Sequence, residues 1–394
     1  MTNELASGPM AAAVAKRLPP LEEELLSFSE DGILDLSREY AGASLPEHVM
    51  AAVEASLVRG ETHYTTRPGL PALARAVAQK LEREQGLTLD PSLGVIISTG
   101  GRESLFAIIQ VLAQPGDEVL VPALRPAYLD ENIRLARARL VPVPVRAEDG
   151  FQVKAAAIRA CLTEKTRLLV LGNPANPTGA VLPAQEMAAI AALAAEYDLT
   201  VISDESLDES IGSQVRHTSI ASFSDAADRT LIVGSFSRLY DLAAWRVGFF
   251  AGPAEIAQPV RDLKQAMTIC TSAMAQYAAL AALTGPQEWL ARRRAEIDLK
   301  RDFMLATLDG MGVPHSNPAA TPYVWVDLRG AGRSSEDVTS WLLAEARVAL
   351  MSGSRFGPQG EGFARLSLWP TSTELEQAMG RMNRALVRAK EGGR

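Results

Sequence analysis

The sequence predicts an α/β fold in which a mostly parallel central sheet lies between helices, with a small α+β domain beside it. From residue 94 onward, short apolar runs rich in β-forming residues alternate with helical patterns. After Pro314 the pattern changes to a few strand-like runs followed by one long helical pattern. A chain of 394 residues is also long for a single core, and it suits a large domain with a smaller one.

The expected elements follow one another along the chain. Strands of the large sheet are expected at residues 95–98, 118–121, 140–145, 167–171, 200–203, 231–233 and 247–251. Helices are expected at 73–81, 103–113, 128–136, about 253–284 and 287–308. Strands at 323–328, 349–352 and 364–368 and a helix at about 372–389 are expected to form the small domain. We therefore expect an N-terminal arm at 1–30, a small domain built from 31–45 and 312–394, and a large domain at 46–311.

Composition and charge exclude several classes of function. A net charge of −8, with no basic block longer than the three arginines at 292–294, argues against a nucleic-acid-binding protein. The two cysteines and four histidines have neither metal-ligand nor catalytic-triad spacing, so we expect no metal site and a reducing compartment. No signal peptide or membrane-length apolar run is present, and the expected location is the cytoplasm.

Two stretches place small and polar side chains where a phosphate can bind. Residues 99–103 include a Gly-Gly pair between an expected strand and an expected helix, where backbone N–H groups can approach an anion. Alone, such a pair is more often only a tight turn. The second stretch, residues 235–246, contains Ser235 and Ser237 and ends on a fixed positive charge, Arg246.

Two further features lie at expected strand ends. Residues 173–179 read Asn-Pro-Ala-Asn-Pro-Thr-Gly, and the two Asn-Pro pairs require an extended, turning backbone. Asp204 leaves an expected buried strand at its carboxyl end, which is where ligands of α/β proteins bind. Without its neighbours, this aspartate would be interpreted as a solvated loop acid or a helix cap.

These motifs resemble those of the class I/II aminotransferases, a family of enzymes of fold type I that depend on pyridoxal 5′-phosphate (PLP). The resemblance covers nearly all of the chain beyond its first thirty residues. It implies a central sheet of the seven-stranded type and a homodimer in which Tyr64 reaches the phosphate of the neighbouring subunit. It also implies that Asn176 binds the 3′-oxygen of the pyridine ring, that Asp204 pairs with the ring nitrogen, and that Arg365 binds the carboxylate of an amino-acid-like substrate. The implied phosphate-binding residues are Gly100, Gly101, Arg102, Ser235, Ser237 and Arg246.

The chain departs from the family pattern at several positions around this site. Arg238 stands at the position of the cofactor lysine, and Glu39 stands at a glycine beside the substrate carboxylate. Leu207 replaces a tyrosine, and Ala244 a glycine. The ring-stacking aromatic falls on Pro126, which leaves Arg125 and Tyr128 as flanking substitutes, and we place Glu39 and Tyr128 with Asn176 and Arg365 among the candidate substrate-binding residues.

The exchange at Arg238 changes the expected chemistry. A lysine amine can lose its proton, attack an aldehyde and shuttle protons, whereas arginine stays protonated in proteins. We therefore expect an aminotransferase-like enzyme of amino-acid or natural-product biosynthesis that binds PLP, its amine form (PMP) or an adduct without a covalent lysine, with Arg238 and Asp204 as candidate catalytic residues. Two alternatives remain open, namely a conventional aminotransferase carrying a Lys→Arg change and a non-catalytic partner subunit of the same fold.

Overall fold

The computed structural model of the chain describes residues 32–392, except positions 41, 43, 211, 213, 214 and 216. The expected N-terminal arm at 1–30 lies outside the described residues. None of the described helices is both long and apolar enough to cross a membrane.

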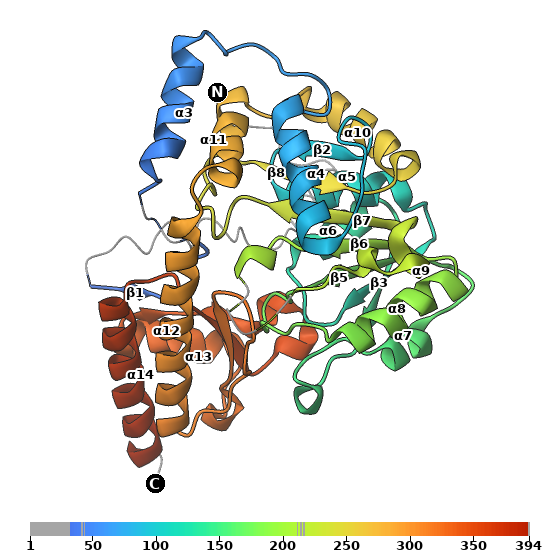
Figure 1. Cartoon of the computed structure of the whole chain (residues 1–394). Coiled ribbons are helices and arrows are strands. Elements are labelled where there is room, and N and C mark those ends of the chain that lie inside the picture. The colour runs from blue at the N-terminus through green and yellow to red at the C-terminus, as the bar shows by residue number, and fades with distance from the viewer. Residues whose placement is uncertain are drawn as a thin grey trace, which may run out of the picture.

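A seven-stranded sheet forms the centre of the larger part of the molecule (Figure 1), in the strand order β2-β8-β7-β6-β5-β3-β4. Neighbouring strands from β4 through β7 pair in parallel, and β8 is antiparallel to both of its neighbours, β7 and β2. The mostly parallel sheet predicted from the sequence is therefore confirmed. The strands are β2 (Val95–Ser98), β3 (Glu118–Pro122), β4 (Arg139–Val143), β5 (Thr166–Gly172), β6 (Thr200–Asp204), β7 (Thr230–Ser235) and β8 (Gly248–Ala251).

Helices cover both faces of this sheet, because successive strand residues point to opposite faces and both sets are apolar. In β3, Val119 and Val121 pack into one core with α5, α6 and α10, whereas Leu120 packs into another with α7 and α8. The helices of the larger part are α3 (Glu47–Val58), α4 (Pro71–Gln85), α5 (Gly101–Leu112), α6 (Tyr128–Leu135), α7 (Ala155–Cys161), α8 (Ala184–Glu196), α9 (Ser224–Ala227), α10 (Ala254–Thr268) and α11 (Ala273–Thr284).

The prediction of a single helix over about 253–284 is wrong. The structure has two helices there, since α10 ends at Thr268 and α11 begins at Ala273. Ile269 adopts a positive φ of 58°, a conformation that a helix cannot continue through. The side chain of Ser272 then caps α11 by accepting a hydrogen bond from the backbone N–H of Ala275. The apolar periodicity of the sequence continues through this break and therefore did not reveal it.

The N-terminal segment joins the C-terminal part of the chain. Strand β1 (Leu34–Asp35) pairs in parallel with β10 (Val348–Ala349), and a second small sheet has the order β11-β12-β9. Figure 1 shows β1 lying beside the C-terminal helices, away from the seven-stranded sheet. The remaining elements are β9 (Tyr323–Asp327), β11 (Met351–Ser352), β12 (Phe363–Ser367), α12 (Glu288–Gly310), α13 (Ser335–Ala346) and α14 (Ser372–Gly392).

Candidate active site

The candidate site lies at the edge where the parallel strands of the large sheet end. Asp204 is the last residue of β6 and pairs in register with Gly172, the last residue of β5. Ser235 ends β7 and pairs with Gly248, the first residue of the reversed strand β8. Residues just before β8, including Arg246, therefore reach the same edge. Ligands of open α/β sheets bind in the crevice outside such an edge.

Two glycines let the backbone lie close to the guanidinium of Arg246 and the hydroxyl of Ser206. A Cβ atom on Gly100, whose φ is +84°, would lie 2.6 Å from Nη2 of Arg246. A Cβ atom on Gly101, the first residue of α5, would lie 3.0 Å from Oγ of Ser206. The backbone N–H groups at this helix start therefore lie beside the guanidinium without side chains between them. N–H groups at a helix start together with a cation suit a phosphate group.

Arg246 is held in this place by backbone and side-chain contacts. Its φ of 52° is rare for a residue other than glycine. Its Nη1 donates to the carbonyl oxygen of Ala243 at 3.1 Å and approaches Oγ of Ser237 at 3.5 Å. Oγ of Ser235 accepts a hydrogen bond from the backbone N–H of Ser237 at 3.1 Å. The four residues therefore form one connected group.

The charges around Arg246 favour an anion. Burial, together with the guanidinium groups of Arg102 and Arg238, lowers the pKa of Arg246 below its ordinary value. Mutual repulsion among cations is relieved when a negative ligand binds between them. We define the phosphate cradle as Gly100, Gly101, Ser235, Ser237 and Arg246.

Asp204 lies in the same crevice without a direct ion pair to these arginines. Its Oδ1 accepts a hydrogen bond from the backbone N–H of Ser206 at 3.1 Å. Burial raises the pKa of Asp204, although the Ser206 hydrogen bonds and the charge of Arg238 partly offset this effect. A cationic group placed against Asp204 would stabilise its ionised form.

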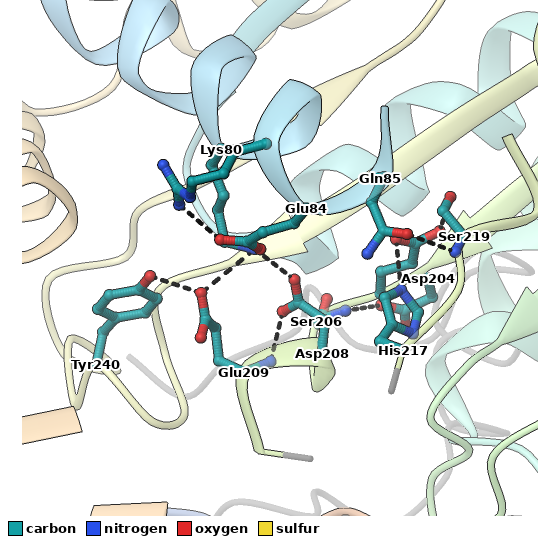
Figure 2. Close-up of polar contacts among 12 residues, drawn as sticks. Lys80, Glu84, Gln85, Asp204, Ser206, Asp208, Glu209, His217, Ser219 and Tyr240 are labelled. Atoms are coloured by element: carbon teal, nitrogen blue, oxygen red, sulfur yellow. Dashed lines mark hydrogen bonds and ion pairs between the residues drawn. The ribbon is translucent and has the colours of Figure 1, made fainter. Parts of the chain in front are cut away.

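A buried ion pair supports the loop that follows Asp204 (Figure 2). Nε2 of His217 lies 2.8 Å from Oε2 of Glu205, and both side chains are less than one tenth exposed. The hydroxyls of Ser203 and Ser219 donate to Oε1 of Glu205 at 2.8 and 2.5 Å. His217 belongs to neither a metal-ligand nor a catalytic-triad pattern in the sequence, and Glu205 was not among the predicted site residues. No local motif marks this pair, because its members lie 12 positions apart.

A second network fixes the next turn of the loop. Nζ of Lys80 on α4 lies 2.7 Å from carboxylate oxygens of Glu84 and Asp208, and 3.3 Å from Glu209. The hydroxyl of Tyr240 donates to Glu209 at 2.8 Å, as Figure 2 shows. Oxygens of the three carboxylates lie within 4.8 Å of one another, a spacing that a metal ion could bridge. The ammonium group of Lys80 lies among them and offsets part of their charge, and Arg294 pairs with Glu209.

The other end of the crevice contains a carboxylate shared by two arginines. Oε2 of Glu39 lies 2.7 Å from Nη2 of Arg238, and Oε1 of Glu39 lies 2.7 Å from Nη2 of Arg365. Nη1 of Arg365 donates to Oδ1 of Asn176 at 2.9 Å. Because a guanidinium only donates, this contact leaves the amide nitrogen of Asn176 free to donate to a ligand. We call Glu39, Arg238 and Arg365 the carboxylate bridge.

Arg365 is the fixed member of the carboxylate bridge. It lies on β12 with a side-chain exposure of 1%, and its guanidinium carbon is 4.0 Å from the ring centre of Tyr323 and 5.1 Å from that of Phe356. Among the described residues, its Nε–H has no hydrogen-bond partner. Glu39 and Arg238 are more exposed, at 30% and 23%.

The carboxylate bridge is ionised at ordinary pH. Burial alone would raise the pKa of Glu39, but the charges of Arg238 and Arg365 outweigh burial and lower this pKa to about 2. Burial likewise opposes the charge of Arg238, yet Tyr323 and Glu39 hold its pKa above the ordinary value. Glu39 is therefore too weak a base to accept a proton from a substrate, and Arg238 holds its proton too tightly to release it.

Of the two expected substitutes for a ring-stacking aromatic, Tyr128 is coupled to the site and Arg125 is not. The guanidinium carbon of Arg102 lies 4.6 Å from the ring centre of Tyr128. Burial and the charge of Asp204 raise the pKa of Tyr128, so the phenol is neutral. Arg125 instead forms two hydrogen bonds with Asp130, at 2.6 and 2.8 Å, and a third with a backbone carbonyl. These contacts hold Arg125 against Asp130 and the backbone, so Tyr128 is the better candidate of the two.

Two other positions singled out from the sequence lie elsewhere. Tyr64, between α3 and α4, is 79% exposed and is not packed into the site of its own chain. Leu207 is buried in the hydrophobic core, with an exposure of 6%.

Four of the five lysine side chains that the structure describes contact residues outside the carboxylate bridge. Besides Lys80, Lys154 pairs with Glu186 and Lys300 pairs with Glu296. Lys165 precedes β5 and is exposed at the opposite, amino edge of the sheet. Lys264 on α10 donates to Oγ1 of Thr268 at 3.3 Å, and that hydroxyl donates to Glu103 in the first turn of α5.

Comparison with known proteins places this site in context. Residues 33–382 match the family model described as aminotransferase class I and II. The chain is 34% identical to an aspartate aminotransferase of Pyrococcus abyssi over 88% of this chain and 89% of that protein. It is 35% identical to an arginine–pyruvate transaminase of Pseudomonas aeruginosa over 85% of this chain and 84% of that protein. The crystal structure of an aromatic aminotransferase from Pyrococcus horikoshii superposes with a TM-score of 0.88 and 33% identity, covering 93% of this chain and 99% of that one.

Proposed function

Because the chain belongs to the class I and II aminotransferase family, whose members use PLP, we propose that its crevice binds PLP, PMP or an amino-acid adduct without a covalent lysine. Ordinary amino transfer is then slow or lost. The residue that carries this proposal is Arg238, which takes the position of the cofactor lysine in the family pattern and is hydrogen-bonded to Glu39.

The fit of the crevice to the cofactor supports noncovalent binding. The phosphate cradle offers backbone N–H groups, two hydroxyls and a guanidinium. Asp204 would face the ring nitrogen and the amide nitrogen of Asn176 the 3′-oxygen, while the neutral phenol of Tyr128 would border the ring. When bound, PLP supplies an electron sink for bonds at the substrate carbon.

The chain's own side chains limit what chemistry can follow. A general base positioned at the reacting carbon typically contributes ~10²–10⁴-fold to a rate. Arg238 keeps its proton, and Glu39, with a pKa of about 2, is a poor base. Arg238 therefore acts as an electrostatic clamp that orients a bound anion rather than as a proton shuttle.

We further propose that the active unit is a homodimer. The exposed ring of Tyr64 is available to a second copy of the chain, where its hydroxyl would donate to the phosphate in the neighbouring cradle. This arrangement explains why a large aromatic side chain remains 79% exposed in a single chain.

Reduction with borohydride tests the proposal directly. The purified protein is mixed with PLP, followed by absorbance, reduced and weighed by mass spectrometry. We expect cofactor uptake without added covalent mass. Arg238→Lys is expected to acquire the covalent mass, because a lysine amine can attack the aldehyde. Its amino-transfer rate should stay low because Glu39 still fills the carboxylate bridge.

Three outcomes would contradict the proposal. A covalent cofactor mass on the unaltered chain would show that a lysine is linked after all. Rapid amino transfer from aspartate, arginine or an aromatic amino acid would favour a conventional aminotransferase. Absence of any cofactor uptake would favour a non-catalytic partner subunit.

A further inference from the structure

In the carboxylate bridge, Glu39 already occupies the place where an anionic ligand would bind the two arginines. Both oxygens of the Glu39 carboxylate are used, one by each arginine, at 2.7 Å. The guanidinium of Arg365, which is fixed between two rings, has one terminal nitrogen on Glu39 and the other on Asn176. Both terminal nitrogens of Arg365 are thus already engaged, and its Nε–H is buried, so a ligand carboxylate would have to compete with Glu39 for the bidentate contact that it prefers.

The segment just before Glu39 is anchored to the C-terminal part of the chain. Nη2 of Arg38 lies 3.0 Å from Oε1 of Glu374 on α14, and Nε of Arg38 donates to the carbonyl oxygen of Asp35 at 3.2 Å. Strand β1 just before it is paired with β10. Moving Glu39 out of the crevice would therefore disturb contacts beyond its own side chain.

The charges around the site also argue against the binding of a second carboxylate at Arg365. Arg102, Arg238 and Arg365 are coupled electrostatically to Glu39, and Arg238 is also coupled to Asp204. Arg246 is coupled to Arg102, Arg238 and Glu103, and Glu103 is in turn coupled to Lys264. The cations around Arg246 would be offset by a phosphate group, which carries a charge of about −2. A ligand carboxylate at Arg365 would instead be repelled by the carboxylate of Glu39, which lies 2.7 Å from the same guanidinium.

We propose that Glu39 supplies, from within the chain, the carboxylate that Arg238 and Arg365 bind, so that the site selects ligands whose end at Arg365 is uncharged. Among the ligands proposed above, this narrows the class to the cofactor's own amine form and to primary amines without a carboxylate beside the amino group, and it disfavours an amino-acid adduct that keeps its carboxylate. The selection of an uncharged end rests on the proposed binding of the phosphorylated cofactor, whereas the role of Glu39 as an internal anion rests on the distances alone.

Anion binding to matched variants tests this role. Succinate, a simple carboxylate probe, is titrated calorimetrically into protein whose cradle is blocked with PLP, and separately with inorganic phosphate. The unaltered chain should bind succinate weakly. Glu39→Gln, which keeps the shape and removes the charge, should bind it at least about tenfold more tightly, because two guanidinium groups lose their internal partner. Glu39→Asp should stay closer to the unaltered chain.

A control and a cofactor titration keep the outcomes distinct. Glu196→Gln removes a carboxylate from the exposed pair with Arg159 and should change nothing. Thermal unfolding of each variant confirms that it is folded. If folded Glu39→Gln binds succinate no more tightly than the unaltered chain, the inference is overturned. If no variant takes up PLP but Glu39→Gln still gains succinate in phosphate, the cofactor proposal fails and the role of Glu39 stands.

Discussion

Arg246 shows how one side chain sets the ligand preference of the crevice. Its backbone adopts a left-handed conformation that costs roughly 1 kcal/mol or more for a residue with a side chain. Its pKa is lowered by burial and by neighbouring cations. Both effects oppose the folded chain unless an anion compensates them, which argues that Arg246 is positioned for a ligand rather than for stability.

The first prediction concerns this residue. Arg246→Gln should weaken PLP binding roughly tenfold or more, because a charge-assisted hydrogen bond to the phosphate is lost. Binding of pyridoxal, which lacks the phosphate, should change little. Absorbance titrations with the two compounds measure the difference. Arg261→Gln on α10, which removes a cation paired with Asp262, is the matched control. An equal loss for both compounds would show that Arg246 supports the fold instead.

At this scale the sequence predicted contacts that are close in the chain and missed those that are distant. Ser235, Ser237 and Arg246 form one short stretch, so their grouping followed from the motif. The bridge from Glu39 to Arg238 spans 199 positions, and the bridge to Arg365 spans 326. The departures at Glu39 and Arg238 were both visible in the sequence, but nothing in it showed that they compensate each other.

At the scale of helices and strands, too, the sequence predicted local features and missed those that depend on distant residues. The strands were predicted well because both of their faces are apolar and their ends carry turn residues. The break between α10 and α11 was missed because it contains neither glycine nor proline, and Ile269 adopts its positive φ only in the folded chain. The loop after β6 was the least predictable element, since buried charges far apart in sequence hold it.

The ion pair between His217 and Glu205 gives this loop a pH-dependent stability. Burial alone would lower the pKa of His217, but the charge of Glu205 outweighs burial and raises it. A raised histidine pKa stabilises the fold fully below its unfolded value of about 6.5, and this contribution is lost as pH rises through the folded value. Burial alone would raise the pKa of Glu205, but His217 and two serines lower it, so its contribution is lost only as pH falls through its folded value. The pair is therefore fully stabilising between about pH 4.5 and 6.5.

The second prediction follows from this window. His217→Gln should lower the free energy of unfolding by about 1–3 kcal/mol at pH 5.5, because a charge-assisted contact to a buried carboxylate is lost. The difference from the unaltered chain should be smaller at pH 9, because the charge of the histidine is lost as pH rises through its folded pKa. Urea unfolding at the two pH values measures it. His63→Gln, at an exposed histidine, should show no such trend. A difference that is the same at both pH values would mean that His217 acts by packing alone.

At the scale of the whole molecule, the candidate site combines residues of the large sheet with residues of the part that contains β1 and β10. Glu39 follows β1, which pairs with β10, whereas Asp204 and Ser235 lie on the large sheet. The α/β class and its mostly parallel sheet were predicted from the alternation of strands and helices. The domain boundaries at 31–45, 46–311 and 312–394 remain a prediction. Periodicity in the sequence does not predict how distant segments are placed relative to one another, because packing between them determines that placement.

Exposed apolar side chains on α3 and near α11 lead to the last prediction. Val58, the last residue of α3, is 83% exposed, and Ile269, between α10 and α11, is 51% exposed; α3 packs against α11. A second copy of the chain would bury them together with Tyr64, since large exposed apolar side chains gain from burial in an interface.

Val58→Asp should therefore shift a dimer to monomers in sedimentation velocity, because an unpaired carboxylate would be buried in the interface. PLP affinity should fall along with it, since Tyr64 would no longer reach a neighbouring cradle. Tyr64→Phe should weaken PLP binding by about fivefold to tenfold while the dimer persists, because one hydrogen bond to the phosphate is lost. Leu299→Asp on α12, at a leucine that is 72% exposed, is the matched control and should stay dimeric. A monomeric unaltered chain with undiminished PLP affinity would show instead that each crevice is complete within one chain and that Tyr64 has no part in it.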